Sequence, residues 1–172
     1  IIKVITGVRR SGKSCLMQMV REELLQSGVM PDNIIFLDLD SKAFRKVKTA
    51  DRLEETIDSL SAKRGMKYLF IDEIQNVKDF EEVVNAFRGS GEYSIFITGS
   101  NSYLLSGELA TKLTGRYVEF ELFPLSFDEY LDMKAFLGKQ VNANLQVELN
   151  NYLQEGGFPK ALEYDDFADK RT

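Results

Sequence analysis

Residues 7–14 read Gly-Val-Arg-Arg-Ser-Gly-Lys-Ser, which matches the pattern G-x-x-x-x-G-K-[ST] at each specified position. The apolar residues 1–5 before this octet predict a buried strand, and residues 15–25 after it predict a helix. A strand that turns through glycines into the start of a helix directs unpaired backbone N–H groups at one point. The stretch therefore predicts a phosphate-binding loop inside an α/β fold.

The chemistry of the octet explains its spacing. Gly7 and Gly12 allow backbone conformations that a Cβ would hinder, and the amides between them can surround a phosphate. Lys13 is long enough to reach the β- and γ-phosphates, and Ser14 offers a hydroxyl to Mg²⁺. The alternative is a chance match in a loop, against which the flanking strand and helix argue. The expected nucleotide-binding residues are Gly7, Val8, Arg9, Arg10, Ser11, Gly12, Lys13, Ser14 and Cys15, the last as small packing rather than a reactive thiol.

A second motif supports the first. Residues 68–73 read Tyr-Leu-Phe-Ile-Asp-Glu, an apolar strand that ends in two carboxylates. In a parallel sheet the carboxyl ends of the strands face the ligand. We therefore expect Asp72 to hold Mg²⁺ and Glu73 to orient or deprotonate an attacking water. An ordinary helix start is the alternative for the acid pair alone, because acids favour that position.

Composition narrows the class of protein. The chain has 172 residues, of which 44% are apolar and 28% charged, as in a globular domain with a sizeable core. No apolar run approaches the roughly 18 residues of a membrane span, and no signal peptide is visible. A single cysteine excludes an internal disulfide and suits the cytoplasm, the expected location. The absence of histidine excludes histidine-based triads, bases and metal sites within these residues.

Strand-like and helix-like segments alternate along the first two thirds of the chain, which favours a parallel sheet covered on both faces. On the first helix, Leu16, Met19, Val20 and Leu24 form the expected apolar face, and Gly28 is the expected C-terminal cap. The predicted strands are 1–5, 34–39, 67–71, 93–98 and 117–122, and the predicted helices are 15–25, 50–63, 80–87 and 102–113.

Beyond Pro124 the pattern contains helices only. Ser126 and Glu129 make a capping box that opens a helix to about residue 137. A second helix is expected over 141–154, and Gly-Gly-Phe-Pro at 156–159 breaks it. The residues expected on one face of this second helix are Leu145, Leu149 and Leu153.

Two further positions are candidates for contact with the transferred phosphate. Residues 98–101 read Thr-Gly-Ser-Asn at the end of the fourth predicted strand, where Asn101 or Ser100 could sense the γ-phosphate. A turn is the alternative for these residues. Arg116 precedes the fifth predicted strand and could neutralise phosphoryl charge, either within its own chain or in a neighbouring subunit. The alternative for Arg116 is a surface ion pair.

A locally basic stretch is the remaining feature. It could touch nucleic acid or an acidic partner, although the net charge of −5 does not favour a nucleic-acid binder. A solvated basic loop is the commoner interpretation. Its residues are Lys42, Arg45, Lys46 and Lys48, with Phe44 among them.

The order of these motifs resembles that of the prokaryotic AAA-type ATPases whose nucleotide domain is followed by a second domain. The resemblance extends from about residue 1 to about residue 164. The motifs that carry it are the octet at 7–14, Asp-Glu-Ile-Gln at 72–75, Thr-Gly-Ser-Asn at 98–101, Leu-Thr-Gly-Arg at 113–116, Pro-Leu-Ser-Phe at 124–127 and Gly-Gly-Phe-Pro at 156–159.

The resemblance implies an ATP-binding fold in which a sensor strand lies between the loop strand and the acid-pair strand. It implies that Lys13 and Ser14 contact phosphate and magnesium, and that Glu73 is the base that activates water. It also implies that Pro159 closes the pocket near adenine. The residues that often precede the first strand in this family are missing here, as is the second domain.

We therefore expect a P-loop NTPase three-layer α/β sandwich with a mostly parallel five-stranded sheet, followed by a small helical lid. The expected core is 1–123, the lid 124–164, and 165–172 the start of a linker to a C-terminal region. The expected partners are ATP or ADP with Mg²⁺, that further region, and a protein partner or a second copy. No membrane contact is expected.

The expected activity is Mg-dependent ATP binding and hydrolysis coupled to a conformational change. A nucleotide-gated binding module with negligible turnover is the first alternative. A small-molecule kinase is less favoured, because the acid pair suits water activation better. A GTPase is disfavoured because no Asn-Lys-x-Asp motif is present.

Overall fold

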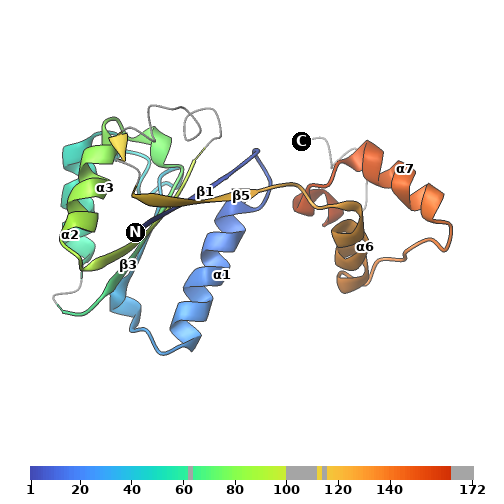
Figure 1. The fold of residues 1–172 in the computed structure, drawn as a ribbon, viewed down its shortest axis with the longest axis horizontal. Helices are drawn as coiled ribbons and strands as arrows, with labels where there is room; N and C mark the ends of the chain where they lie inside the picture. Colours follow the sequence, from blue (N-terminus) through green and yellow to red (C-terminus); the bar gives the residue numbers. More distant parts are fainter. Residues whose placement is uncertain (62–63, 100–111, 114–115, 164–172) are drawn as a thin grey trace. The chain divides into compact units, whose positions relative to one another are not determined.

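The computed structural model describes residues 1–61, 64–99, 112–113 and 116–163. Its centre is a five-stranded sheet in the order β2-β3-β4-β1-β5, in which β2 and β3, β3 and β4, and β1 and β4 pair in parallel (Figure 1). The α/β fold that the sequence predicts is confirmed, including the strand inserted between the loop strand and the acid-pair strand. The strands are β1 (Ile2–Gly7), β2 (Ile34–Asp38), β3 (Lys67–Asp72), β4 (Tyr93–Thr98) and β5 (Tyr117–Leu122).

The described chain divides into two compact units. The first unit contains Ile1–Gly7 and Lys13–Glu121, and the second contains Val8–Gly12 together with the chain from Leu122 onward. The α-helices of the first unit are α1 (Lys13–Gln26), α2 (Ala50–Leu60) and α3 (Phe80–Gly89), and those of the second are α6 (Phe127–Phe136) and α7 (Leu145–Glu155). Short 3-10 helices are η1 (Pro31–Asn33), η2 (Ile74–Asn76) and η3 (Pro159–Leu162).

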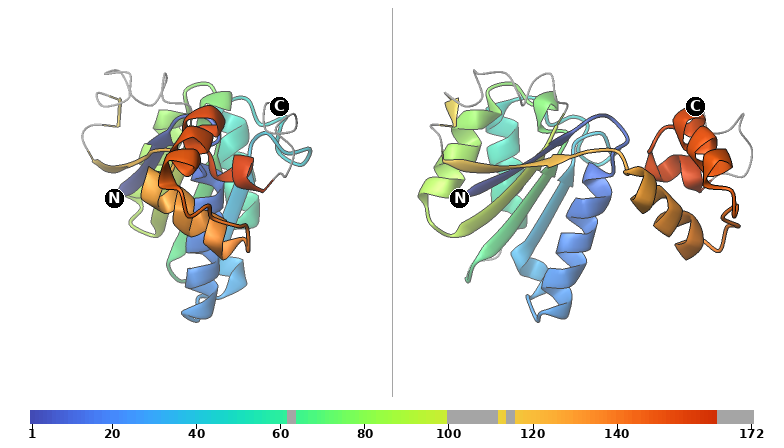
Figure 2. Two further views of the ribbon diagram at one scale, coloured as in Figure 1. Left: turned by 90° about the vertical axis from the view of Figure 1, so that its right-hand side faces the viewer. Right: turned by 45° about the vertical axis from the view of Figure 1, so that its right-hand side comes forward.

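Helices cover both faces of the sheet in the first unit (Figure 2). One face packs against α1 through a cluster that includes Ile5, Met17 and Phe70. The other face packs against α2 and α3 in a larger cluster that includes Leu53 and Phe80, both fully buried. The sheet is therefore the middle of three layers, as expected.

The buried face of α1 contains Met17 in place of Met19, which the sequence predicted. Met19 is 61% exposed, whereas Met17 is fully buried against Ile5 and Phe70. The helix begins at Lys13, and residues 13, 17, 20 and 24 follow its 3.6-residue period on the sheet side. The predicted apolar face was wrong at Met19, because residues 16, 19 and 20 fit a helical period almost as well as residues 13, 17, 20 and 24 do.

The second unit is a helix pair with a mixed aromatic and ionic core. Tyr130 is 1% exposed and its ring lies 5.4 Å from that of Tyr152. Lys134 Nζ lies 2.7 Å from Glu148 Oε2, and both side chains are largely buried. Burial alone would raise the pKa of Glu148, but hydrogen bonds from Lys134 and the Asn142 amide outweigh it and lower that pKa. This pair ties α6 to α7.

The starts of the two helices of the second unit are set by side-chain caps. The predicted capping box is present, with Ser126 and Glu129 each bonding the other's backbone N–H. The second helix begins four residues later than expected, because the Asn144 side chain accepts a hydrogen bond from the Gln146 amide and caps α7. Leu145 and Leu153 are 57% and 69% exposed and Leu149 is half-buried, so these three leucines do not form a buried face of α7.

We predict that Gly157→Ala strongly destabilises the second unit. An ideal Cβ on Gly157 would lie 2.2 Å from the carbonyl oxygen of Leu125, which is backbone and cannot turn away. The same two residues share a hydrogen bond from Leu125 N to Gly157 O of 2.6 Å. The expected loss of unfolding free energy is about 3 kcal/mol, measured as amide exchange in α6 and α7.

The matched control is Gly89→Ala, whose added Cβ meets nothing within 4 Å. This substitution lies in α3 and is expected to change stability by no more than about 1 kcal/mol. If Gly157→Ala leaves amide exchange in α6 and α7 as slow as Gly89→Ala does, the close contact between Gly157 and Leu125 is not a constraint on this unit.

Candidate active site at the carboxyl ends of β1, β3 and β4

The strand register brings Gly7, Thr98 and the acid pair to one edge of the sheet. Ile71 pairs with Ile97 in the β3–β4 ladder, and Thr98 pairs with Ile5 in the β4–β1 ladder. Asp72 therefore follows directly beside Thr98, and Gly7 lies two residues beyond Ile5. Since all three strands are parallel, their carboxyl ends meet here, where ligands of open α/β sheets bind.

The loop after β1 has the backbone of an anion-binding turn. Gly7 and Gly12 have positive φ values of 142° and 100°, and Arg10 also has a positive φ, of 71°. A non-glycine residue in that region is uncommon and marks a constrained conformation. Ser11 N donates to Val8 O at 3.2 Å and closes the turn. Successive amides held in such a turn form a concavity for a phosphate.

The buried Ser11 hydroxyl gives a direct test of whether this turn fits an anion. Ser11 is 3% exposed, and its Oγ has no hydrogen-bond partner in the described part of the chain. A buried hydroxyl without a partner costs free energy unless a ligand supplies one. The loop residues therefore fit an oxygen-rich anion such as a phosphate chain.

Lys13 is positioned by the last residue of β1. Its side chain is 7% exposed, and its Nζ donates to the Gly7 carbonyl oxygen at 2.9 Å. The ammonium group therefore lies over the end of β1, at the edge that also holds Asp72 and Thr98. Ser14 and Cys15 follow on the first turn of α1, and both are exposed.

The two acids are organised by Thr98. Its Oγ1 donates a hydrogen bond to Asp72 Oδ1 and accepts one from Glu73 N at 3.1 Å. Asp72 is 5% exposed and Thr98 fully buried, so these bonds are shielded from water. Glu73 is in the left-handed region, with φ of 57° and ψ of 47°, and its carboxylate accepts a hydrogen bond from Gln75 Nε2.

Thr98 and Gln75 belong to the quoted motifs at 98–101 and 72–75, but the sequence assigned neither of them a role. Thr98 ends a predicted strand, and only the register reveals that its hydroxyl reaches the acid pair. Gln75 belongs to the quoted stretch at 72–75, but nothing in its spacing shows that it bonds Glu73. A polar residue at the end of an apolar strand was the available signal for Thr98.

The expected metal ligands have suitable chemistry. Mg²⁺ takes oxygen ligands and is commonly held by one or two carboxylates together with substrate phosphates. Asp72 offers such a carboxylate, and Ser14 is an exposed hydroxyl at the start of α1. Among the described residues no group of three or more His, Cys, Asp or Glu side chains could form a metal cage by itself. This donor set suits a metal that binds together with a nucleotide.

Arg116 does not join this edge of the sheet. Its backbone oxygen accepts from Ile2 N at 3.4 Å, at the beginning of β1. The strand from Ile2 to Gly7 covers about 16 Å at a rise of 3.3 Å per residue, so Arg116 lies near the opposite edge. This geometry disfavours a contact with the site of its own chain, and both a contact from a neighbouring subunit and a surface ion pair stay predictions.

The positions of the remaining predicted site residues stay predictions. Ser100 and Asn101, and the helix expected over 102–113 except for its last two residues, lie outside the described residues. Pro159 begins η3 in the second unit, and its contact with adenine stays a prediction. The second unit contains Val8–Gly12 as well as the chain from Leu122 onward, and the expected division into 1–123, 124–164 and 165–172 stays a prediction.

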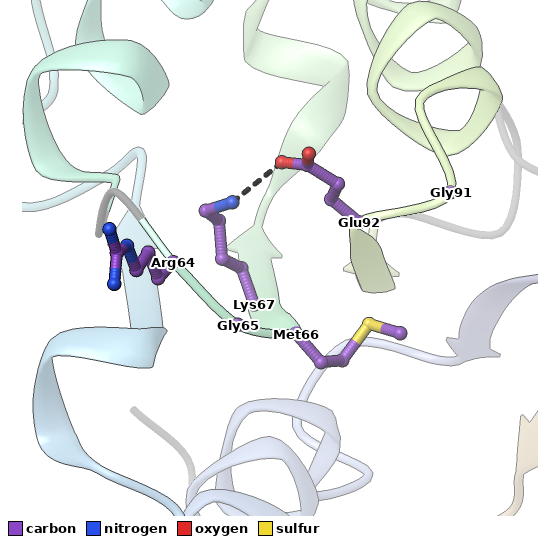
Figure 3. A pocket seen from close by; sticks show the side chains of 6 residues that line it. All are labelled: Arg64, Gly65, Met66, Lys67, Gly91 and Glu92. Atoms are coloured by element: carbon purple, nitrogen blue, oxygen red, sulfur yellow. Dashed lines mark hydrogen bonds and ion pairs between the residues drawn. The ribbon is translucent and has the colours of Figure 1, made fainter.

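A separate hollow lies at the opposite edge of the sheet (Figure 3). Its volume is about 280 Å³, and it is formed where β3 and β4 begin rather than where they end. Lys67 Nζ lies 2.7 Å from Glu92 Oε2 there, and this hydrogen bond raises the pKa of Lys67. The hollow is open and lacks the phosphate-loop residues. Its lining residues are Arg64, Gly65, Met66, Lys67, Gly91 and Glu92.

The basic stretch is a surface loop after β2. Phe44 packs against the core and Val47 is 8% exposed, so two apolar residues anchor the loop. The four basic side chains, Lys42, Arg45, Lys46 and Lys48, are exposed. A contact with an acidic partner or nucleic acid stays a prediction. No described helix has the length and apolar character that crossing a membrane requires.

Comparison with known proteins places this geometry in a class. The family model described as "AAA domain" matches residues 1–131. The chain belongs to this family, and its α/β sheet with a phosphate-loop turn is a P-loop nucleotide-binding domain of the AAA type. The expected family and fold class are therefore confirmed.

Relatives in sequence share nearly the whole chain. An uncharacterized protein of Haemophilus influenzae is 43% identical over 171 residues, which cover 96% of this chain and 41% of the relative. An uncharacterized protein of Methanocaldococcus jannaschii is 37% identical over 171 residues, which cover 96% of this chain and 37% of the relative. The chain thus spans about two fifths of the length of these relatives.

Solved structures support the fold. The Aeropyrum pernix ORC2 protein, in its ADP form, has a TM-score of 0.56 at 15% identity, covering 94% of this chain and 54% of that one. A DNA polymerase III gamma subunit-related protein of Thermotoga maritima also has a TM-score of 0.56, at 13% identity, covering 94% and 51%. The Cdc6p of Pyrobaculum aerophilum has a TM-score of 0.54 at 13% identity, covering 78% and 42%. At these identities the likeness concerns the fold alone.

Proposed function

We propose that this chain binds Mg-ATP at the carboxyl ends of β1, β3 and β4 and hydrolyses it. The observation that carries the proposal is the shared edge, where Lys13 lies over the end of β1 and Thr98 ties Asp72 to Glu73. The family and the ADP form of one structural neighbour support a nucleotide as the ligand. ATP is favoured over GTP because no guanine-reading motif is present.

Each residue has a defined part in the proposed reaction. The loop amides from Gly7 to Ser14 bind the β-phosphate, and the Lys13 ammonium contacts the β- and γ-phosphates. Ser14 and Asp72 would hold Mg²⁺, which neutralises charge on the phosphate oxygens when it is bound. Glu73 accepts the proton of the attacking water. Asn101 senses the γ-phosphate, and Pro159 closes the pocket near adenine.

The nucleotide state would control the shape of this edge. A bound γ-phosphate would order the loops after β3 and β4, and hydrolysis would release them. The attached domain implied by the longer relatives, or a protein partner, would detect that change. The position of Arg116 suggests a second copy of the chain, whose Arg116 would complete the site in trans.

One observation favours a second candidate, a nucleotide switch with negligible turnover. The Glu73 carboxylate bonds Gln75, so the proposed base is engaged by its own chain. That bond restrains the carboxylate and occupies Oε2, which would slow its approach to a water, and a switch would keep this restraint. A small-molecule kinase is a weaker candidate, because the acid pair leaves no evident need for an acceptor other than water.

Phosphate release measured against protein concentration separates these candidates. With saturating Mg-ATP, the specific rate is expected to rise with concentration, because Arg116 must come from a neighbouring subunit. A specific rate independent of concentration would favour a site that is complete in one chain. Tight Mg-ATP binding without phosphate release at any concentration would favour the switch. Thermal stabilisation by GTP that exceeds stabilisation by ATP would contradict the choice of nucleotide.

A further inference from the structure

The hydroxyl of Thr98 occupies a position between the two acids that neither motif describes. Thr98 is fully buried at the last position of β4, between the strand that leads to the loop and the strand that ends in Asp72. Its Oγ1 is bonded to the Asp72 carboxylate on one side and to the Glu73 backbone on the other. One oxygen atom therefore contacts both residues of the acid pair.

The direction of these two hydrogen bonds is set by chemistry. A backbone N–H can only donate, so Glu73 N donates to Thr98 Oγ1 at 3.1 Å. An ionised carboxylate can only accept, so the single hydroxyl proton of Thr98 points to Asp72 Oδ1. The chain of bonds runs from Glu73 through Thr98 to Asp72, and it uses the only proton the hydroxyl has.

Both bonds have consequences for the acids that they contact. The bond to Oδ1 orients the Asp72 carboxylate and leaves Oδ2 as the oxygen without a hydrogen-bond donor in the described part of the structure. The backbone of Glu73 has a φ of 57° and a ψ of 47°, and the bond from Glu73 N helps to hold it there. Residues other than glycine adopt this left-handed conformation rarely, and it persists where the surrounding structure imposes it. That conformation sets the direction in which the Glu73 side chain leaves the backbone.

We propose that Thr98 is a positioning residue, which presents Asp72 Oδ2 to the metal and aims Glu73 at the attacking water. This inference rests on the proposed function, because it concerns the same site. Thr98 acts through the two acids and is not assigned a contact with the nucleotide. This role differs from that of Ser100 and Asn101, which follow Gly99 and are expected to sense the γ-phosphate.

The test compares Thr98→Val, which keeps the shape and removes the hydroxyl, with Thr98→Ser, which keeps the hydroxyl and removes the methyl group. With Thr98→Val, phosphate release is expected to fall about 100-fold, because both acids lose their orientation. The gain in ATP affinity on adding Mg²⁺ is expected to shrink at least about tenfold, because Asp72 Oδ1 loses its donor. Affinity for ATP in EDTA should change by less than about threefold, because the loop is untouched.

Thr98→Ser is expected to stay within about threefold of the wild type in all three measurements. Equal losses in the valine and serine variants would overturn the proposal, since the methyl group and its packing would then be what matters. Unchanged Mg²⁺-dependent affinity in a folded valine variant would also overturn it. If Thr98→Val does not fold by circular dichroism, Thr98→Ala replaces it, and the same comparison with serine decides.

The readouts separate this inference from the proposed function. The Mg²⁺-dependent gain in affinity does not need turnover, so it tests Thr98 even in a chain that only binds. A wild-type chain that hydrolyses ATP beside an unaffected Thr98→Val variant overturns only the role of Thr98. A wild-type chain without saturable Mg-ATP binding overturns the proposed function and this inference together.

Discussion

Glu73→Gln is expected to lower phosphate release by at least about 100-fold while ATP binding persists. Glutamine has nearly the same shape as glutamate but cannot accept the proton of the attacking water at neutral pH. The hydrogen bond to Thr98 Oγ1 uses only the backbone N–H of Glu73, so the substitution leaves it in place. A 100-fold loss corresponds to about 2.7 kcal/mol of activation free energy, within the range of a lost general base.

The measurement is single-turnover phosphate release, with affinity for Mg-ATP determined separately by calorimetry. Glu82→Gln is the matched control, because Glu82 is exposed on α3 and has no part in the proposed reaction. Turnover in Glu73→Gln equal to that of Glu82→Gln would remove Glu73 from the mechanism. A joint loss of binding and turnover would give it a role in binding rather than in catalysis.

Lys13→Ala is expected to abolish measurable nucleotide binding. The Lys13 ammonium is buried over the end of β1, where it is the predicted partner of the β- and γ-phosphates. Removing a hydrogen bond to a charged group costs about 1.5–3 kcal/mol, so affinity should fall roughly 10- to 150-fold for each phosphate group that the ammonium would bind. Calorimetric titration with Mg-ATP measures this change.

Lys78→Ala serves as the control for the change in charge. Its side chain is 83% exposed, so the substitution changes net charge as Lys13→Ala does but leaves the phosphate loop as it is. Binding in Lys78→Ala should equal that of the wild type. Retention of wild-type affinity in Lys13→Ala would mean that the octet at 7–14 is not the phosphate site.

Much of the secondary structure could be predicted from the sequence because local patterns decide it. Strands β4 and β5 have the predicted bounds, since polar or turn-forming residues stand near both ends of each strand. The capping box at Ser126 is a local hydrogen-bond pattern, and it formed as expected. Features that depend on three or four neighbouring residues were thus accessible.

Features that depend on the register of distant segments were not accessible in the same way. The contact of Thr98 with the acid pair requires β4 to lie between β1 and β3 with one particular register. The buried face of α1 was misassigned at Met19 because helical period alone leaves neighbouring faces nearly equivalent.

The position of Arg116 could have been anticipated in part. A residue that precedes a strand of a parallel sheet lies at the edge opposite the strand's carboxyl end, where ligands bind. The pairing of Arg116 with Ile2 agrees with that rule. The direction of the strand thus argues against a contact of Arg116 with the site of its own chain, which the Gly-Arg motif alone could not show.

The most direct test of the account is a calorimetric titration of the wild-type chain with ATP, in Mg²⁺ and in EDTA. Saturation at one nucleotide per chain is expected, with tighter binding in Mg²⁺. The reason is that Lys13 and the loop bind the phosphates while Ser14 and Asp72 hold the metal. A titration with folded protein that shows no saturation in either buffer would contradict it.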